Sequence, residues 1–158
     1  MKPNELMIGD LVNVTGKEGL HNNDIIALLP RIGKVVGMDE ETVYVDYIDY
    51  PFFLGDIEPV HLTTDILEAN GLCKGRTFVQ HSLTNHTNTG KRFYPYTLLL
   101  GDGRVVITVT IDDDGKRELE IATPAAHVMV KDCQHVHQLQ HALRLCGIDI
   151  DIKLKKED

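Results

Sequence analysis

The chain of 158 residues has no tryptophan, only 6% aromatic residues and only three cysteines. Cys73, Cys133 and Cys146 are widely spaced and form no CxxC pair, so they predict neither a disulfide framework nor a zinc ribbon. No apolar run approaches the roughly 18 residues that would cross a membrane, and the first residues lack the apolar segment of a signal peptide. We therefore expect a cytoplasmic protein with no membrane-spanning helix.

Phosphate-binding loops are missing as well. Gly101-x-Gly103 and Gly33-Lys34 are the nearest approaches, and neither opens a predicted helix, which both the dinucleotide and the P-loop mechanisms require. No cofactor is expected.

Basic residues are few. There are 16 Lys and Arg against 24 Asp and Glu, which gives a formal charge of −8. Binding to nucleic acid or to an anionic membrane depends on Lys and Arg near phosphates, so this charge disfavours both. A protein partner or self-association is the expected contact. The hydrophobic content of 42% is typical of a folded domain.

Short β-branched runs dominate the first 62 residues. The predicted strands are residues 7–14, 31–38, 42–48 and 56–62. Asp39-Glu40-Glu41 suits a hairpin, and Pro59 predicts an edge position for the fourth strand because proline donates no ladder hydrogen bond. Residues 15–30 predict a long loop with a helical turn at residues 24–29. This pattern favours an SH3-like small barrel, although periodicity allows an open sheet equally well.

A short helix of about two turns is predicted, with Thr63-Thr64-Asp65 supplying an N-cap and Asn70-Gly71 a C-terminal stop. The strands predicted after it form an antiparallel meander: residues 78–83, 93–100, 104–111, 117–122 and a short run at 127–130.

The clearest helix lies near the end of the chain, between an N-cap at Asp132 and Gly147. Its predicted buried face contains Val136, Leu139, Leu143 and Cys146. The alternating residues 148–152 could add an edge strand. The expected class is therefore α+β, mostly β. An SH3-like barrel plus short helix would span residues 1–72, and a meander with a packed C-terminal helix would span 73–158.

The chain contains eight histidines, a residue type that can bind metal ions or act in catalysis. His137 and His141 share a helix face at i and i+4, a spacing that can hold one metal ion. Gln138 stands where the zincin pattern has its glutamate, and amides are poor ligands and cannot act as general bases. A third ligand would have to come from elsewhere, such as His127, His81 or an aspartate. The alternative is a polar helix face with a structural role.

Two surface regions are candidates for binding. Aromatic residues concentrate beside an acidic stretch, which suggests a protein contact through Tyr47, Tyr50, Phe52 and Phe53. Residues 74–92 contain no acidic residue and several cations, which suggests an anion or single-strand contact through Lys74, Arg76, Lys91 and Arg92.

Two further features have plain interpretations. Asp112-Asp113-Asp114-Gly115 is too short for a calcium loop and predicts a solvated hairpin turn. Cys133 directly precedes the histidine-rich segment, but the sequence fixes no base beside it.

Three motifs, in order, carry a resemblance. They are Asn4-Glu5-Leu6-Met7-Ile8-Gly9-Asp10, Ile57-Glu58-Pro59-Val60-His61-Leu62-Thr63 and Val136-His137-Gln138-Leu139-Gln140. In these motifs the chain resembles an uncharacterised family of small proteins from gut Bacteroidetes and their phages or mobile elements, with Met7 departing from that family's usual basic residue. The resemblance implies a bacterial or phage cytoplasm but no activity. It marks His137, Gln138 and Gln140 as a helix motif that is either functional or an anchor for the helix.

The first interpretation is therefore a non-enzymatic accessory or interaction protein that acts through protein contacts. The alternatives are a metal-dependent hydrolase centred on His137 and His141, and a nucleic-acid-binding accessory that uses residues 74–92.

Overall fold

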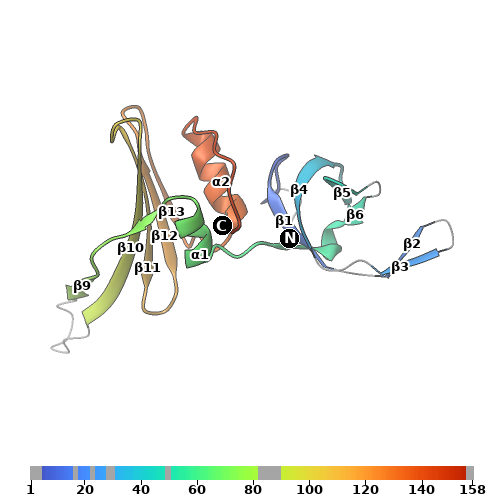
Figure 1. Cartoon of the computed structure of the whole chain (residues 1–158), viewed down its shortest axis with the longest axis horizontal. Helices are drawn as coiled ribbons and strands as arrows, with labels where there is room; N and C mark the ends of the chain where they lie inside the picture. The colour runs from blue at the N-terminus through green and yellow to red at the C-terminus, as the bar shows by residue number, and fades with distance from the viewer. Residues whose placement is uncertain are drawn as a thin grey trace. The chain divides into compact units, whose positions relative to one another are not determined.

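The computed structural model describes residues 5–15, 18–21, 24–27, 31–48, 51–81 and 90–155. Within these residues the chain is mostly β, with antiparallel sheets and two α-helices (Figure 1), which confirms the coarse fold class. Its contacts divide it into two units, Met1–His61 with His135–His137, and Leu62–Gln134 with Gln138–Asp158. The short helix thus belongs to the second unit, whereas the sequence prediction placed it with the first.

The first unit contains a five-stranded sheet in the order β6-β5-β4-β1-β7. Its strands are β1 (Leu11–Val14), β4 (Arg31–Met38), β5 (Thr42–Val45), β6 (Phe52–Phe53) and β7 (Ile57–Pro59). The β4–β5 hairpin and the edge position of β7 were both predicted. No ladder between described residues joins β6 to β7, the two ends of this order, so the sheet is not closed into a barrel.

Two parts of this unit differ from the sequence prediction. The helical turn predicted at residues 24–29 is wrong, because β2 (Glu18–His21) and β3 (Asp24–Ala27) pair as an antiparallel hairpin. Strand β6 and the 3₁₀ turn η2 (Leu54–Asp56) that follows it were not predicted. A strand of two residues contains too little alternation to give a period.

The core of the first unit lies on one face of its sheet. Alternate residues along each strand are almost fully buried, as period-2 side-chain geometry requires. They are Val12, Val14, Val35, Val43, Val45 and Ile57.

The second unit contains a sheet in the order β13-β12-β11-β10-β8, with β9 also paired to β10. Its strands are β8 (Cys73–Lys74), β9 (Phe78–His81), β10 (Gly90–Leu100), β11 (Val105–Asp112), β12 (Arg117–Ala122) and β13 (His127–Lys131). The predicted meander is confirmed. One face of β11 and β12 is buried, through Ile107, Val109, Ile111, Leu119 and Ile121.

The two helices end as expected but do not both begin as expected. Helix α1 (Thr64–Ala69) is capped by Thr63, whose hydroxyl accepts a hydrogen bond from the Ile66 N–H at 3.3 Å. Helix α2 (Val136–Leu145) ends before Gly147, which has a φ of +69°.

The predicted N-cap at Asp132 is wrong, because that residue has a φ of +64°, four positions before α2 begins. The buried face of α2 is confirmed at Val136, Leu139 and Leu143. The tail does not form the suggested strand at residues 148–152. Neither described helix is long and apolar enough to span a membrane.

Candidate functional site

Exposed apolar side chains gather on the outer face of the β4–β5–β6 part of the first sheet. Thr42 pairs with Phe53 and Val43 with Phe52, so Phe53 and Tyr44 both point away from the core. Phe53 is 64% exposed and Tyr44 is 41% exposed. Val36, 54% exposed, is the extra residue where the β4–β5 register shifts between Val35 and Gly37. We call Val36, Tyr44 and Phe53 the aromatic face.

Gly37 lies opposite Tyr44 on the neighbouring strand. It pairs directly with Tyr44 across the two strands, and a Cβ on Gly37 would lie 3.6 Å from the Tyr44 Cδ2 atom. That distance is ordinary van der Waals contact, so the Tyr44 ring lies against the backbone of β4.

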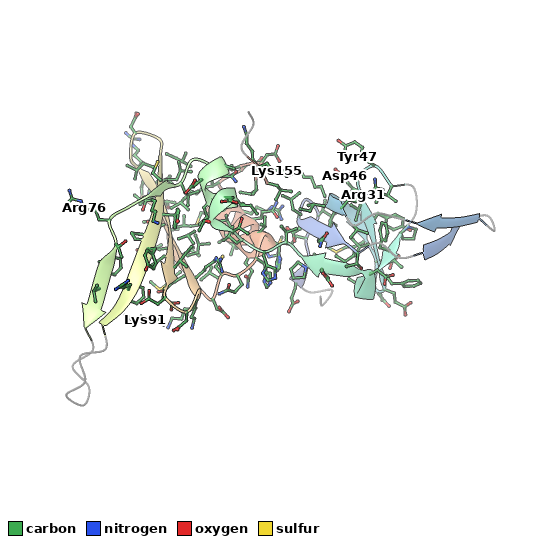
Figure 2. All side chains as sticks on the ribbon, turned by 60° about the horizontal axis from the view of Figure 1, so that its bottom comes forward. Arg31, Asp46, Tyr47, Arg76, Lys91 and Lys155 are labelled. Atoms are coloured by element: carbon green, nitrogen blue, oxygen red, sulfur yellow. The ribbon has the colours of Figure 1, made fainter. Side chains whose placement is uncertain are left out.

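Tyr47 is the most exposed large side chain near the aromatic face. It is 95% exposed and has a φ of +62°, a conformation that costs a non-glycine residue about 1 kcal/mol. The preceding residue fixes this turn to β4, because the Asp46 carboxylate accepts the Lys34 N–H at 2.7 Å and the Asp46 N–H donates to the Lys34 carbonyl at 2.9 Å. Figure 2 shows Tyr47, Asp46 and Arg31 on the same side of this unit.

The four predicted contact residues therefore differ in exposure. Tyr47 and Phe53 are exposed and available to a partner, whereas Phe52 is 6% exposed and belongs to the core. Tyr50 lies outside the described residues. Val36 was missed, because a bulge shifts the alternation that would have assigned it to a face.

An acidic connection adjoins the aromatic face at Phe53. The Glu41 carbonyl accepts a hydrogen bond from the Leu54 N–H at 3.2 Å, which holds this connection next to β6. Asp39 is used within the turn, where its carboxylate accepts from the Glu41 N–H, the Thr42 hydroxyl and the Thr42 N–H. These bonds lower the pKa of Asp39.

The two glutamates of this connection differ from Asp39, whose carboxylate accepts hydrogen bonds within the turn. Glu40 and Glu41 are exposed, and their carboxylates make no hydrogen bond or ion pair with the described residues.

The predicted metal site at His137 and His141 gains no third ligand in the described part of the chain. His137 is 7% exposed, and its ring stacks on that of His135 with centroids 5.6 Å apart. His135 in turn contacts His61 at 5.0 Å. No group of three or more His, Cys, Asp or Glu side chains among the described residues is arranged to hold a metal ion. The histidines form a packed stack of rings, and the metal site stays a prediction.

The Val-His-Gln-Leu-Gln motif lies mostly in buried positions. Four of its five residues are buried, namely Val136, His137, Leu139 and Gln140. The Val136 N–H donates to the Val60 carbonyl at 2.9 Å, in the segment that follows β7.

Cys133 is unsuited to nucleophilic chemistry. Its side chain is fully buried, and burial raises the pKa of its thiol to about 12 despite the nearby Arg117. A thiol with this pKa contributes almost no thiolate at neutral pH, and the thiolate is the reactive form.

The predicted basic region does not form one cationic surface. Lys91 lies between two carboxylates, with Nζ 2.6 Å from Asp112 and 2.7 Å from Asp114. The Nζ atom of Lys74 lies 5.6 Å from the centre of the Tyr94 ring. Figure 2 shows Arg76 and Lys91 at separate places on the second unit.

Arg92, the fourth predicted cation, is also exposed, and its backbone N–H donates to Asp113. Lys91 is thus already paired within the chain, and the anion contact stays a prediction.

A depression of about 220 Å³ opens on the sheet of the second unit beside Lys91. Three lysines and three acidic residues line it, so its charges balance and it has no preference for ligands of one sign. The lining consists of Lys91, Phe93, Thr110, Asp112, Lys116, Glu118, Lys131 and Asp132.

A second depression, of about 330 Å³, lies at the β7 edge of the first unit. Among the described residues that line it, Glu58 and His61 have ionisable side chains. One carboxylate and one imidazole do not complete a nucleophile, base and orienting group.

Comparison with known proteins finds no matching family model, no matching curated protein and no matching solved structure.

Proposed function

We propose that this chain is a non-enzymatic interaction protein whose first unit contacts a protein partner through the aromatic face and Tyr47. The observation that carries the proposal is the exposure of Tyr44, Tyr47 and Phe53 in a chain with only 6% aromatic residues. Tyrosine and phenylalanine are enriched at protein interfaces, where a few large side chains supply most of the binding energy. The resemblance described above supports a role as an accessory of a bacterial mobile element or phage.

The two alternatives receive less support. A metal-dependent hydrolase would need a third ligand beside His137 and His141. A nucleic-acid accessory would need free cations in residues 74–92, and Lys91 is held by two aspartates.

We also propose that the first unit is an SH3-like small barrel left open between β6 and β7. The strand order supports this, as do the β2–β3 hairpin inserted between β1 and β4 and the single 3₁₀ turn η2 between β6 and β7. An experimental structure in which the end strands lie far apart and face different layers would contradict it.

Photo-crosslinking tests the interaction. A benzophenone amino acid replaces Phe53 in one variant and Leu145 in another, because Leu145 is 79% exposed and lies in the second unit. We expect the variant at position 53 to form a specific protein adduct in cells that carry the gene, and the variant at 145 not to form it. Adding Tyr44→Ser to the variant at position 53 should suppress the adduct while the circular dichroism spectrum shows that the protein stays folded. Equal adducts at both positions, or none, would refute the proposal.

A further inference from the structure

The two units differ sharply in charge. The first 61 residues contain eleven Asp and Glu against four Lys and Arg, a formal charge of −7. Residues 62–158 contain thirteen against twelve, a formal charge of −1. Almost all of the net charge of −8 is therefore on the unit that carries the aromatic face.

We infer that the partner segment that docks on the aromatic face is a protein stretch combining Lys or Arg with apolar residues. This inference rests on the proposed function and adds the chemistry of the partner. Val36, Tyr44 and Phe53 offer exposed apolar area, and the carboxylates of Glu40 and Glu41 beside them are exposed and pair with no cation among the described residues. A cationic segment with apolar side chains satisfies both, and Lys or Arg can also lie over the aromatic rings.

The same charges disfavour other occupants. If a second copy of this chain docked here through the same unit, two units with a formal charge of −7 each would repel one another. The phosphates of nucleic acid would likewise be repelled by the carboxylates beside the aromatic face. The described basic side chains of the first unit are those of Arg31 and Lys34, both on the first half of β4. Thr42, which pairs with Phe53, directly follows Asp39-Glu40-Glu41. The Phe53 end of the face is thus bordered by acidic residues.

Peptide titration tests the inference on the full chain. The probes are three 12-residue peptides with the same valine and threonine positions, in which every second residue is Lys, Gln or Glu. Binding is measured by fluorescence anisotropy, and the contact is mapped by amide chemical-shift changes. We expect the Lys peptide alone to bind, to shift amides of β4, β5 and β6, and to weaken steeply between low and high salt.

Charge reversal provides the matched control. Glu40→Lys with Glu41→Lys should weaken binding of the Lys peptide by roughly tenfold or more. Asp102→Lys with Asp149→Lys makes the same change in net charge on exposed residues of the second unit, and should weaken it by less than about threefold.

The outcomes separate the two proposals. Equal weakening by both double variants, shifts outside β4–β6, or no binding of the Lys peptide would overturn the inference. The Gln peptide could bind as tightly as the Lys peptide and lose its binding in Tyr44→Ser and Phe53→Ser. That result would also overturn the inference, and it would leave the proposed function intact.

Discussion

Gly33 shows how one residue limits the packing of the first sheet. A Cβ at this position would collide with the Val45 side chain, which is 1% exposed, and would lie 3.1 Å from the Asp46 carboxylate oxygen. That carboxylate accepts the Lys34 N–H and holds the turn that carries Tyr47. The glycine is required by close approach, since its backbone needs no positive φ.

Gly33→Ala should therefore destabilise the protein by about 1–3 kcal/mol, because overpacking a filled site forces side chains and backbone to shift. Gly55→Ala is the matched control, since nothing lies within 4 Å of a Cβ built there. Urea unfolding of both variants measures the difference. A Gly33→Ala variant as stable as the Gly55→Ala variant would show that Val45 can move aside.

At the scale of elements, the turn between β11 and β12 uses its acidic residues internally. The Asp112 carboxylate accepts the N–H groups of Asp114 and Lys116, and Lys91 of β10 bridges it to Asp114. Asp113 accepts the Arg92 N–H at 2.9 Å and the Tyr94 hydroxyl at 3.2 Å. The sequence predicted a solvated turn and a separate basic region. In the structure, hydrogen bonds and ion pairs join the two into one network between the start of β10 and the end of β11.

This network predicts a pH dependence. Burial raises the pKa of Asp112, but the bonds from Lys91 and from the Lys116 and Asp114 N–H groups outweigh it, so the pKa lies below the ordinary value of 3.8. A carboxylate whose pKa is lowered on folding stabilises the folded state. This stabilisation is fully present above pH 3.8 and is lost as the pH falls toward the pKa of the folded state.

Asp112→Asn should therefore lower the stability at pH 7 by about 1–2 kcal/mol and weaken the loss of stability below pH 4. Asp102→Asn is the control, in the turn between β10 and β11. Thermal melts between pH 2 and 7 provide the measurement. Parallel profiles for Asp112→Asn and the unmodified chain would contradict the role given to this carboxylate.

At the scale of the whole molecule, the concentration of charge in the first 61 residues has a consequence for stability. Like charges on one compact unit repel one another, and salt screens that repulsion. The second unit, with a formal charge of −1, has little net repulsion to screen.

Raising the ionic strength from 10 to 150 mM should therefore slow amide hydrogen exchange in β1 and β4 more than in β11 and β12. Native-state exchange followed by NMR reports both sets of strands in one sample, so each set is the control for the other. An equal change in both sets would show that the charge asymmetry does not affect stability.

The sequence predicted those elements that have a clear period and clear ends. Strands β4 and β11 contain several β-branched residues, and the Gly-Asp-Gly and Asp-Gly turns mark where β10 ends and β12 begins. Thr63-Thr64-Asp65, Asn70-Gly71 and Gly147 marked helix ends because their backbone chemistry is local. The buried face of α2 was also predictable, because it depends only on the spacing of apolar residues within the helix.

Features that depend on distant partners were not predictable. Strand β6 has two residues, and only its pairing with β5 decides that Phe52 enters the core and Phe53 faces outward. Lys91 looked like part of an anion surface because Asp112 and Asp114, far along the chain, become its neighbours only after β10 pairs with β11.

The sequence by itself determined the mostly β class, the absence of a long apolar helix and the unequal charge of the two halves, because composition and local periodicity contain that information. Only the tertiary structure decided which aromatic side chains are exposed and which charges are already paired. The physical reason is that exposure and pairing are set by strand register, and register is fixed by contacts between residues that are distant in the chain.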